Sequence, residues 1–378
     1  MTKLDRLIAE LCPDGVEYVP LGEIYDFQYG TGNTIPSSGG EYPVYGSNGI
    51  VGQHTEYNSE DSPVIGHIGA YAGIVNWGKG KHFVTYNGVI CKTKEGVACP
   101  KFAYYLLLVQ DFGSMAKSAS HPFVSYDTLK SPVVPLPPLP VQREIVRILD
   151  NFTELTAELT AELTARRKQY NYYRDELLTF RDDVPMVALG EVCELVRGNG
   201  LQKKDFTESG VGCIHYGQIY TFYGTFTERT KSFVSLELAR TLKTVRKGDL
   251  IITNTSENVD DVCKAVAWLG NDDIVTGGHA TILKHKQNPK YLAYYTQSTM
   301  FHIEKRKYAG GTKVIDVSAT NMAKIKIPLP SLEEQSRLVT ILDRFDTLVN
   351  DITSGLPAEI EARRKQYEWY RDRLLRFS

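Results

Sequence analysis

Three short motifs in this 378-residue sequence have residue types that could bind a nucleotide or perform catalysis. Gly30-Thr31-Gly32 and Gly198-Asn199-Gly200 are compatible with nucleotide-binding loops, but both lack the third glycine and the acidic residue of that fingerprint. We interpret them as turn or bulge glycines. Asn288-Pro289-Lys290-Tyr291 partly matches the Asn-Pro-Pro-aromatic motif of amino-methyltransferases, but Lys290 replaces the second proline, so we expect a helix N-terminus there. No P-loop, HExxH motif or nuclease-type carboxylate cluster is evident in the sequence, and we predict no catalytic residue.

The cysteines give no sign of a metal site. All six are scattered, without CxxC or Cys/His ligand spacing, at positions 12, 91, 99, 193, 213 and 263. This spacing argues against structural zinc and against a disulfide scaffold, and it fits a reducing compartment. No apolar run approaches the ~18 residues that a membrane span needs. We therefore expect a soluble cytoplasmic protein with no bound metal.

Two stretches of the chain are nearly the same. Residues 161–180 (AELTARRKQYNYYRDELLTF) and 358–377 (AEIEARRKQYEWYRDRLLRF) are identical at 14 of 20 positions, which indicates an internal duplication. Apolar residues recur at helical spacing in and before both stretches, for example at Phe345, Leu348 and Ile352. A stripe this narrow suits a single partner helix. We predict two long helices that pack antiparallel, one of them from about Pro140 to Phe180.

The two predicted helices differ in one place. The first contains three tetrads of the type Ala-Glu-Leu-Thr over residues 153–164, whereas the second contains Ser354-Gly355-Leu356-Pro357, where the proline should interrupt the helix. One added tetrad would move the part of the chain beyond it by ~6 Å and rotate it by roughly 40°. Ser331 and Glu334 are expected to form a capping box at the start of the second helix.

Repeated phrases also frame two globular regions. Leu21-Gly22-Glu23 returns as Leu189-Gly190-Glu191, and each region ends in a Pro-Leu-Pro phrase, but the interiors barely resemble each other. We therefore expect an α/β (α+β) fold with a pseudo-two-fold internal repeat. Two globular domains with mixed or antiparallel sheets would be joined by two long antiparallel coiled-coil helices. The expected segments are an N-terminal helix and turn (1–18), domain 1 (19–138), a central helix (139–184), domain 2 (185–330) and a C-terminal helix (331–378).

In combination these features resemble the specificity subunit of type I restriction-modification systems. The resemblance rests on the repeated ARRKQYxxYRD helix, the PLPxLxxQ entry to each helix, the LGE openings and the tetrads, and it covers the whole chain. It implies a non-catalytic subunit in which each of two target-recognition domains binds one half of a bipartite double-stranded DNA site. It also implies that the helices set the spacer between the half-sites and dock two methyltransferase (modification) subunits, and that the N-terminal helix packs near the C-terminal helix.

The resemblance assigns the chemistry to partners. Restriction subunits would join the full complex, and the adenine-N6 methyltransferase, endonuclease and ATPase activities would belong to the partner subunits. S-adenosylmethionine, ATP and Mg would bind those subunits, with no cofactor on this chain. Two alternatives stay open, namely a structural coiled-coil adaptor and a DNA-binding subunit of a modification-only complex. The adaptor explains the helices but gives the two divergent polar domains no role.

Charge separates the two domains. The whole chain has a net charge of -2, so an anionic partner must be met by local patches. Residues 19–135 contain 7 Lys, 9 Asp and Glu and no arginine, which excludes the arginine–guanine contact from domain 1. The Gly46–Gly49 and Lys79–His82 segments are expected to be loops with polar tips, although each is also compatible with an ordinary turn. The candidate DNA contacts of domain 1 are Ser47, Asn48, His67, Tyr71, Lys79, Lys81, His82, Tyr86, Asn87, Ser120 and His121.

Domain 2 is expected to provide more of the phosphate affinity. Residues 187–328 contain 19 Lys and Arg against 14 Asp and Glu, a net charge of +5. The cluster at 305–307 is equally well explained as a solvated helix face, His215 and His279 as buried structural histidines, and Tyr216 as a core residue. The candidate contacts are Arg197, Asn199, Lys203, Lys204, His215, Tyr216, Gln218, Asn254, Ser256, Asn258, His279, Lys305, Arg306, Lys307 and Lys313.

Identical basic and aromatic residues on the two helices suit a symmetric task. Arg166, Arg167, Arg363 and Arg364 are predicted to serve in docking two identical partners, with contact to DNA phosphates as the alternative. Four tyrosines lie on the packing stripe and are expected in the interhelical core: Tyr170, Tyr173, Tyr367 and Tyr370.

Overall fold

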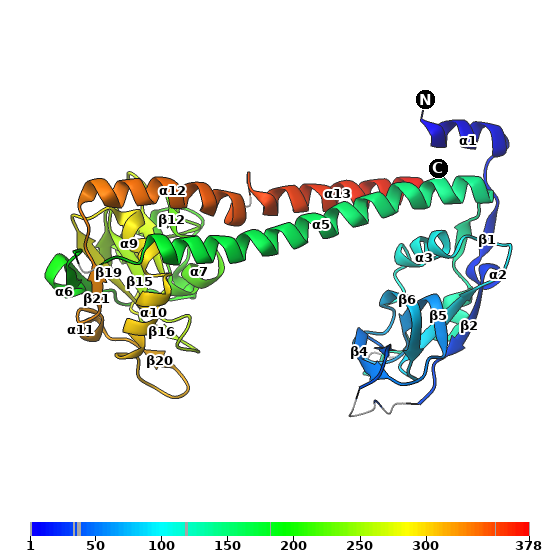
Figure 1. The fold of residues 1–378 in the computed structure, drawn as a ribbon, viewed down its shortest axis with the longest axis horizontal. Helices are drawn as coiled ribbons and strands as arrows, with labels where there is room; N and C mark the ends of the chain where they lie inside the picture. The colour runs from blue at the N-terminus through cyan, green and yellow to red at the C-terminus, as the bar shows by residue number, and fades with distance from the viewer. Residues whose placement is uncertain are drawn as a thin grey trace. The chain divides into compact units, whose positions relative to one another are not determined.

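The chain forms two compact units. The structure, a computed structural model, describes residues 2–32, 35, 39–117, 120–181, 183–351 and 353–377, so Ile352 of the predicted stripe lies outside the described residues. Unit 1 comprises residues 1–158 and 360–378, and unit 2 comprises residues 159–359 (Figure 1).

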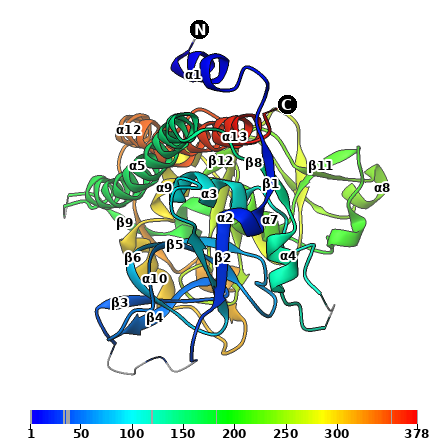
Figure 2. The ribbon, with the colours of Figure 1, turned by 90° about the vertical axis from the view of Figure 1, so that its right-hand side faces the viewer.

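Unit 1 is built on a six-stranded sheet with the strand order β2-β7-β5-β6-β3-β4. Neighbouring strands are antiparallel except for the parallel pair β3 and β6. Its strands are β2 (Tyr25–Tyr29), β3 (Tyr42–Gly46), β4 (Gly49–His54), β5 (Ser59–Gly66), β6 (Val75–Val84) and β7 (Gly88–Thr93). A separate two-stranded sheet pairs the entry and exit segments of the unit, β1 (Tyr18–Pro20) with β8 (Val133–Pro135), as Figure 2 shows from this side.

The expectation that Lys79–His82 forms a loop was wrong. These residues lie within β6, where Lys81 pairs with Glu60 and His82 pairs with Ser59. The strand period of two explains the misreading, because it turns Lys79 and Lys81 to solvent and His82 into the core. A glycine at position 80 with φ of 62° and a register shift opposite it bend the strand at this point.

The helices of unit 1 form a layer against the sheet. They are α1 (Lys3–Leu11), α2 (Leu21–Ile24), α3 (Pro100–Leu108) and α4 (Tyr126–Lys130), with the first part of α5 (Leu139–Leu177) and most of α13 (Leu356–Leu374). Phe102 and Leu106 of α3 share one buried cluster with Ile145 and Leu149 of α5. Helix α3 therefore lies between the sheet and α5 (Figure 1).

The two ends of the chain meet in unit 1, as the resemblance implied. Leu4 of α1 is buried in the same cluster as Leu375, which comes directly after α13. The Lys3 ammonium lies 2.8 Å from the Glu144 carboxylate at the start of α5. The Tyr18 hydroxyl donates a 2.6 Å hydrogen bond to the carbonyl oxygen of Arg376.

Unit 2 repeats this layering around a larger β-region. A five-stranded sheet has the order β10-β19-β15-β17-β12 and a four-stranded sheet has the order β13-β11-β18-β14, and both contain parallel and antiparallel pairs. The strands of these two sheets are β10 (Cys193–Arg197), β11 (Val211–Ile214), β12 (Phe226–Thr227), β13 (Ser232–Val234), β14 (Lys243–Val245), β15 (Leu250–Thr253), β17 (Ala265–Trp268), β18 (Ile274–Thr276) and β19 (Ala280–His285). Two short pairs complete the unit, namely β9 (Met186–Ala188) with β21 (Lys326–Pro328), and β16 (Thr255–Ser256) with β20 (Ile315–Asp316).

The helices of unit 2 correspond in part to those of unit 1. They are α6 (Leu189–Val192), the 3-10 helix η1 (Lys203–Asp205), α7 (Tyr216–Thr221), α8 (Leu236–Ala239), α9 (Pro289–Tyr295), α10 (Thr299–Arg306), α11 (Ala319–Met322) and α12 (Leu332–Asn350). Helix α9 lies between the five-stranded sheet and α12, as α3 does in unit 1 between its sheet and α5 (Figure 1). Asn288 caps α9 by accepting hydrogen bonds from the backbone N–H groups of Lys290 and Tyr291, which confirms that this motif is a helix start.

The long helices form as expected. Helix α5 is continuous over 39 residues, whereas the second copy is divided into α12, which ends at Asn350, and α13, which begins at Leu356 directly before Pro357, as the proline predicted. Phe152 stacks on Tyr370 within unit 1, and Tyr173 stacks on Phe345 within unit 2, so each unit has an antiparallel helix pair. Only half of the predicted capping box forms, because Ser331 accepts from the Glu334 N–H while the Glu334 carboxylate binds Arg337.

The mixed α/β fold with two sheet-rich domains is confirmed, and the five segment boundaries stay a prediction. Within the part of the chain that the structure describes, no helix has the length and apolar character to cross a membrane.

Candidate nucleic-acid interface

Four segments of unit 1 converge on one surface, here called the unit 1 loop surface: the turn at 46–49, the loop at 67–74, the turn at 85–87 and residues 120–123. The Ser47 hydroxyl lies 2.8 Å from the carbonyl oxygens of both Ile68 and Asn87. The backbone N–H of His67 donates to the Asn87 carbonyl, and that of Gly69 donates to the Pro122 carbonyl, both at 2.8 Å. Eight of the predicted contacts are thereby brought together: Ser47, Asn48, His67, Tyr71, Tyr86, Asn87, Ser120 and His121.

Aromatic rings support this surface from beneath. His67 is only 6% exposed, and its Nδ1 lies 3.1 Å from the Val124 carbonyl oxygen. Its ring lies 4.3 Å from the Tyr29 ring and meets Tyr86 edge-on at 5.5 Å. Tyr86 and Tyr71, by contrast, are about half exposed. His67 therefore supports the surface from within, whereas Tyr86 and Tyr71 are exposed enough to contact a ligand.

The remaining candidates of unit 1 lie on β6. Lys79 and Lys81 are exposed, and the Lys81 ammonium lies 4.6 Å from the centre of the Tyr57 ring, where a hydrogen bond to the Tyr57 hydroxyl raises the pKa of the lysine. His82 has no exposed surface, and its Nδ1 lies 2.8 Å from the Gly80 carbonyl oxygen. Burial lowers the pKa of His82, which favours a neutral core imidazole, so we no longer propose it as a DNA contact.

Unit 2 has a pocket of about 560 Å³ between α7 and the segment after β15, with aromatic and polar side chains in its lining. Tyr216, Ser256 and Asn258, all predicted contacts, line it. The Asn258 side chain donates a 2.7 Å hydrogen bond to the Asp261 carboxylate and accepts a 2.8 Å hydrogen bond from the Asp261 backbone N–H. These two bonds fix the loop. His279 lies next to the pocket, because its ring is 4.8 Å from the Tyr216 ring and its Nδ1 is 3.1 Å from the Thr255 hydroxyl.

Two predicted contacts behind this pocket have structural roles. His215 is buried, and its Nδ1 accepts a hydrogen bond from the Gly217 N–H, capping α7. Burial first, and then the charge of Lys203, lowers the pKa of His215 and favours the neutral ring that this cap requires. The Gln218 side chain is held by the His215 backbone N–H at 3.1 Å and by the Ser232 hydroxyl at 2.7 Å.

The entry segment of unit 2 lies close to the same region. Arg197 is exposed, and its Nε donates to the Gly278 carbonyl oxygen at 3.1 Å, directly before His279. Asn199 donates to the Thr241 carbonyl at 2.9 Å, while Lys203 and Lys204 are exposed on η1. Gly198 permits the close approach of this segment, since a Cβ there would lie 2.2 Å from the Gly277 carbonyl oxygen. This supports the interpretation of the glycine pairs as packing and turn residues.

Most of the predicted Lys305–Lys307 cluster stabilises the fold and is not free to contact DNA. Lys305 is 1% exposed, and its ammonium donates 2.6 Å hydrogen bonds to the carbonyl oxygens of Asp260 and Val262. Burial lowers the pKa of Lys305 to about 8. Arg306 pairs with the Asp260 carboxylate at 2.7 Å, and Lys307 pairs with Glu304. Lys305 and Arg306 thus hold the loop that lines the pocket. Lys313 is exposed beside Val314 of the lining.

Asn254 is likewise not available to a ligand. It is fully buried, donates to the Val317 carbonyl at 2.7 Å and accepts from the Thr281 hydroxyl at 2.9 Å. The sequence did not indicate that Asn254 is buried, because an asparagine directly after an apolar strand can equally lie in an exposed loop.

Sequence reasoning missed the other side chains of the pocket. The Tyr220 hydroxyl lies 2.6 Å from the Thr253 hydroxyl and 2.9 Å from the Thr255 carbonyl oxygen, and Lys264 donates to the Tyr220 carbonyl at 3.3 Å. Burial lowers the pKa of Lys264. A spacing of four residues between Tyr216 and Tyr220 on one helix face is the signal that would have placed both tyrosines together.

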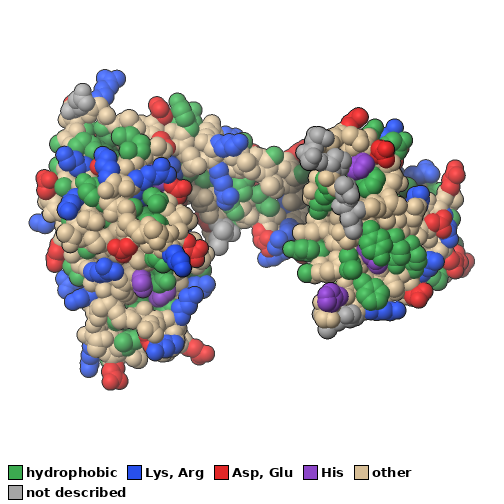
Figure 3. All heavy atoms as spheres, turned by 90° about the horizontal axis from the view of Figure 1, so that it is seen from below, with side chains coloured by type: hydrophobic (Ala, Val, Ile, Leu, Met, Phe, Trp, Pro, Cys, Tyr) green, Lys and Arg blue, Asp and Glu red, His purple; other side chains and the backbone are tan. Residues whose placement is uncertain are grey.

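The visible faces of the two units differ in their side chains. In Figure 3 a hydrophobic patch with histidine side chains is visible on unit 1, whereas Lys and Arg side chains, interspersed with Asp and Glu, are spread across unit 2. No group of three or more His, Cys, Asp or Glu side chains among the described residues is arranged to hold a metal ion.

The helix tyrosines divide into two kinds. Tyr170 is 4% exposed and its hydroxyl lies 3.4 Å from Asp346, and Tyr367 packs against the unit 1 core. Tyr173 is 42% exposed, so it covers Phe345 from the solvent side and is not fully in the interhelical core as expected. The arginines lie on the outer surface, where Arg166 contacts Glu162 and Gln169, Arg364 contacts Glu361, and Arg363 contacts Gln366.

A family comparison decides what kind of protein this is. The family model of the type I restriction modification DNA specificity domain matches residues 13–166 and again residues 181–362. The chain belongs to this family. Specificity subunits are non-catalytic components of type I restriction-modification systems, and their role is to recognise DNA.

Curated relatives and solved structures agree with the family. The chain is 32% identical to the specificity subunit of the EcoR124I/EcoR124II type I restriction enzyme of Escherichia coli, over 100% of this chain and 97% of the relative. It is 31% identical to a putative type I restriction enzyme specificity subunit of Haemophilus influenzae, over 100% of both chains. The fold resembles the crystal structure of the type I S subunit of M. genitalium, with a TM-score of 0.60, 16% identity and coverage of 95% of this chain and 96% of that chain.

Proposed function

We propose that this specificity subunit binds an asymmetric, bipartite DNA sequence, with unit 1 contacting one half-site and unit 2 the other. The observation that carries this proposal is the contrast between a duplicated frame and two different surfaces. Both units have the same entry and exit strand pair, the same helix on the sheet and the same helix pair. The unit 1 loop surface and the unit 2 pocket share no such likeness, which suits two targets of different sequence.

The contacts would differ in kind between the halves. Unit 1 offers hydroxyl, amide and imidazole groups at Asn48, Tyr71, Tyr86 and His121, which can bind base edges, and two exposed lysines on β6 for phosphates. Unit 2 offers Arg197, Lys203 and Lys204 for phosphates beside a pocket of tyrosine and asparagine side chains. The net charge of +5 in the second region fits a larger share of the salt-dependent affinity.

The helices would dock two modification subunits. Tyr172 and Trp369 occupy the same position in the two repeats and are 61% and 54% exposed. Each packs edge-on against the neighbouring tyrosine, Tyr173 and Tyr370, which keeps a large ring on the helix surface. Exposed aromatic residues flanked by arginine are typical of interface hot spots. Equivalent sites on two helices suit two identical partners.

The chemistry would then be that of the partners. Each modification subunit would bind S-adenosylmethionine and methylate an adenine in one half-site, and restriction subunits with ATP and Mg would complete the complex. Because a methyltransferase must extract its base, the assembly is expected to distort the duplex. The tetrads at 153–164, within the continuous helix α5, would set the spacer between the half-sites.

The test is the methylation pattern that the subunit directs. Single-molecule sequencing of methylated adenines would compare cells that express this chain with its modification subunit and cells that express the modification subunit alone. A split motif present only with this chain is expected. Replacing residues 200–320 with the matching region of a relative should alter one half-site only. A continuous motif, or a change in both half-sites, would contradict the proposal.

A further inference from the structure

The unit 1 loop surface exposes several large apolar side chains, here called its apolar cluster. The cluster consists of Ile68, Tyr71 and Ile74 of the 67–74 loop, Tyr86 of the 85–87 turn, and Ile50, which directly follows the 46–49 turn. These five side chains are between 39% and 62% exposed. A hydrophobic patch is also what Figure 3 shows on unit 1. Exposed apolar side chains that gather on one surface mark a binding site.

Backbone contacts hold the segments of this cluster together. The Gly66 N–H donates a 2.8 Å hydrogen bond to the Ile74 carbonyl, and the Ile74 N–H donates to the Tyr71 carbonyl at 3.2 Å. Gly66 also lets two other carbonyl groups approach closely, since a Cβ there would lie 2.3 Å from the Tyr71 oxygen and 2.5 Å from the Ser47 oxygen. The 46–49 turn and the 67–74 loop are therefore fixed against each other before any ligand binds.

An apolar surface on a DNA-recognition domain has one apolar match among the base edges. The major groove presents hydrogen-bonding groups together with the C5-methyl group of thymine. An aliphatic side chain that covers a hydrogen-bonding group leaves that group without a partner, which costs free energy. Packing against a methyl group instead removes apolar area from water on both sides. Residues 19–135 also contain no arginine for contacts with guanine.

We propose that unit 1 recognises thymine in its half-site through the C5-methyl group, which would pack against Ile50, Ile68 and Ile74. The proposal rests on the proposed function, in which unit 1 contacts one half-site. Asn48 is exposed in the turn directly before Gly49 and Ile50, and an asparagine amide can bind N6 and N7 of the adenine in the same base pair. Unit 1 would thus select A·T pairs by an apolar contact beside a polar one.

Unit 2 should depend less on thymine methyl groups. Val314 is the only aliphatic side chain among the described residues that line its pocket. The two half-sites therefore supply an internal comparison within one DNA molecule.

Replacing thymine with deoxyuridine tests the proposal, because it removes the methyl group and keeps the base pair. The methylation motif would give the site, and the exchange of residues 200–320 would show which half belongs to unit 1. Fluorescence anisotropy would then compare duplexes for binding to the full complex of this chain with its modification subunits. Deoxyuridine in the unit 1 half-site should weaken binding about fourfold for each thymine whose methyl group is buried. Deoxyuridine in the unit 2 half-site should have a much smaller effect.

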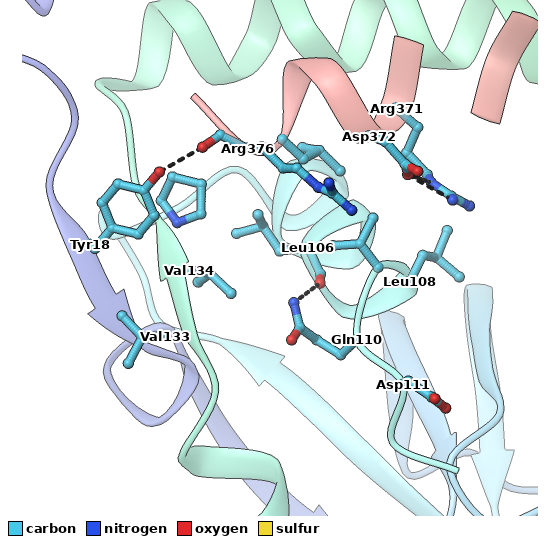
Figure 4. Close-up of a pocket in the computed structure, with 13 residues that line it drawn as sticks. Tyr18, Leu106, Leu108, Gln110, Asp111, Val133, Val134, Arg371, Asp372 and Arg376 are labelled. Atoms are coloured by element: carbon cyan, nitrogen blue, oxygen red, sulfur yellow. Dashed lines mark hydrogen bonds and ion pairs between the residues drawn. The ribbon is translucent and has the colours of Figure 1, made fainter. Parts of the chain in front are cut away.

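Two variants assign the contact to the apolar cluster. Ile50→Ser and Ile68→Ser should weaken binding to thymine DNA and reduce the difference between thymine and deoxyuridine DNA, because both changes remove the same contact. Val133→Ser is the matched control and should keep the full thymine preference. Val133 is exposed on β8 and lines a groove of about 480 Å³ near the end of α13, to which no segment of the loop surface contributes (Figure 4).

Three results would overturn the proposal. Equal affinity for thymine and deoxyuridine DNA, while base-pair changes in the unit 1 half-site still abolish binding, would exclude the methyl contact and leave the proposed function intact. Base-pair changes without effect in that half-site would overturn the proposed function as well. A thymine preference that both isoleucine variants retain in full would exclude the apolar cluster as its source.

Discussion

Tyr294 donates a 2.7 Å hydrogen bond to Oδ1 of Asp343 and so joins α9 to α12. In unit 1 the equivalent Tyr105 bonds the equivalent Asp150 at 2.5 Å and joins α3 to α5. Both tyrosines are buried. The duplication is thus preserved down to a single hydrogen bond between the helix on the sheet and the long helix, although the two β-regions differ in strand number and order.

Replacing Tyr294 with Phe should lower the free energy of unfolding by about 1–2 kcal/mol, because it removes this hydrogen bond and keeps the ring. Asp343 would keep its 2.7 Å ion pair with Lys290. Urea denaturation would measure the loss, and a double-mutant cycle with Asp343→Asn should give a coupling energy of about 1 kcal/mol. Additive effects of the two substitutions would show that the contact contributes nothing to stability. Tyr105→Phe is the matched variant in unit 1, and a similar cost is expected.

Acid should weaken unit 2 through His285. Its Nδ1 accepts a hydrogen bond from the Gln287 N–H at 3.2 Å, and burial lowers its pKa from 6.5 to about 4. Between pH 6.5 and pH 4, His285 is therefore protonated in the unfolded chain and neutral in the folded chain. The stability that the neutral ring contributes is therefore complete above pH 6.5 and is lost as the pH falls through 4. The complete loss should be roughly 3 kcal/mol.

Thermal unfolding of wild type and His285→Gln at pH 7 and at pH 4.5 would test this. The variant should lose less stability than wild type on acidification, because glutamine does not titrate. An equal loss in both proteins would assign the pH dependence to other groups.

Tyr216 is the aromatic group of the unit 2 pocket that we expect to matter most for DNA binding. Tyr216→Ala should weaken binding by about 1–3 kcal/mol, the usual value for a ring that stacks on a base. Phe222→Ala is a suitable control, since Phe222 is 53% exposed and does not line the pocket. Fluorescence anisotropy of the assembled complex with its methylation site would report both variants. Equal affinities for the two variants would argue that Tyr216 only packs.

Docking of the modification subunits should depend on Tyr172 and Trp369. Each single substitution by Ala should remove one modification subunit, and the double substitution should remove both, because the two sites are equivalent. Analytical ultracentrifugation of the complex would give the stoichiometry. Tyr57→Ala, at an aromatic residue of unit 1 that is 45% exposed, is the control and should keep both subunits. Full stoichiometry in the double variant would exclude these rings from the interface.

Motifs in the sequence predicted the frame well because both copies repeat them. The glutamine of PLPxLxxQ shows why such a motif persists. Gln142 accepts from the Cys99 N–H at 2.8 Å and donates to the Pro137 carbonyl at 2.7 Å, and Gln335 makes the same two bonds with Asn288 and Pro330, both at 2.9 Å. Sequence alone marked the glutamine as part of a pattern, whereas its role in fastening the long helix to the sheet helix required coordinates.

Single polar residues were much harder to place from sequence. His82, Asn254 and Lys305 are buried and satisfied by hydrogen bonds to backbone carbonyl oxygens or neighbouring side chains, whereas Asn48 and Lys203 are exposed. Nothing in the local sequence separates the two groups, since Lys305 and Lys203 both lie beside a second basic residue. Whether a polar group is desolvated depends on strands and helices that come from distant segments, as when Lys305 of α10 meets the carbonyl of Asp260. Local sequence patterns contain no information on such long-range contacts.

The tetrads provide a sharp test of the proposal that the helices set the spacer. Residues 153–164 lie within α5, where the Thr153 and Thr156 hydroxyls bond the carbonyl oxygens four residues earlier and keep the helix regular. An additional Thr-Ala-Glu-Leu tetrad after Leu163 should therefore extend the helix by ~6 Å and rotate the remainder of α5 by roughly 40°. The spacer of the methylated motif should lengthen by about one to two base pairs, since DNA rises ~3.4 Å per base pair along each strand.

Both half-sites should stay the same in that variant, because the insertion lies outside the unit 1 loop surface and the unit 2 pocket. Methylome sequencing would report the spacer and the half-sites in one measurement. The matched control inserts four residues that cannot continue the helix, such as Gly-Pro-Gly-Ser, at the same place. It should abolish methylation instead of shifting the spacer, because glycine and proline would end the helix within the tetrads. A changed half-site in the tetrad variant would show that α5 contributes to base recognition itself.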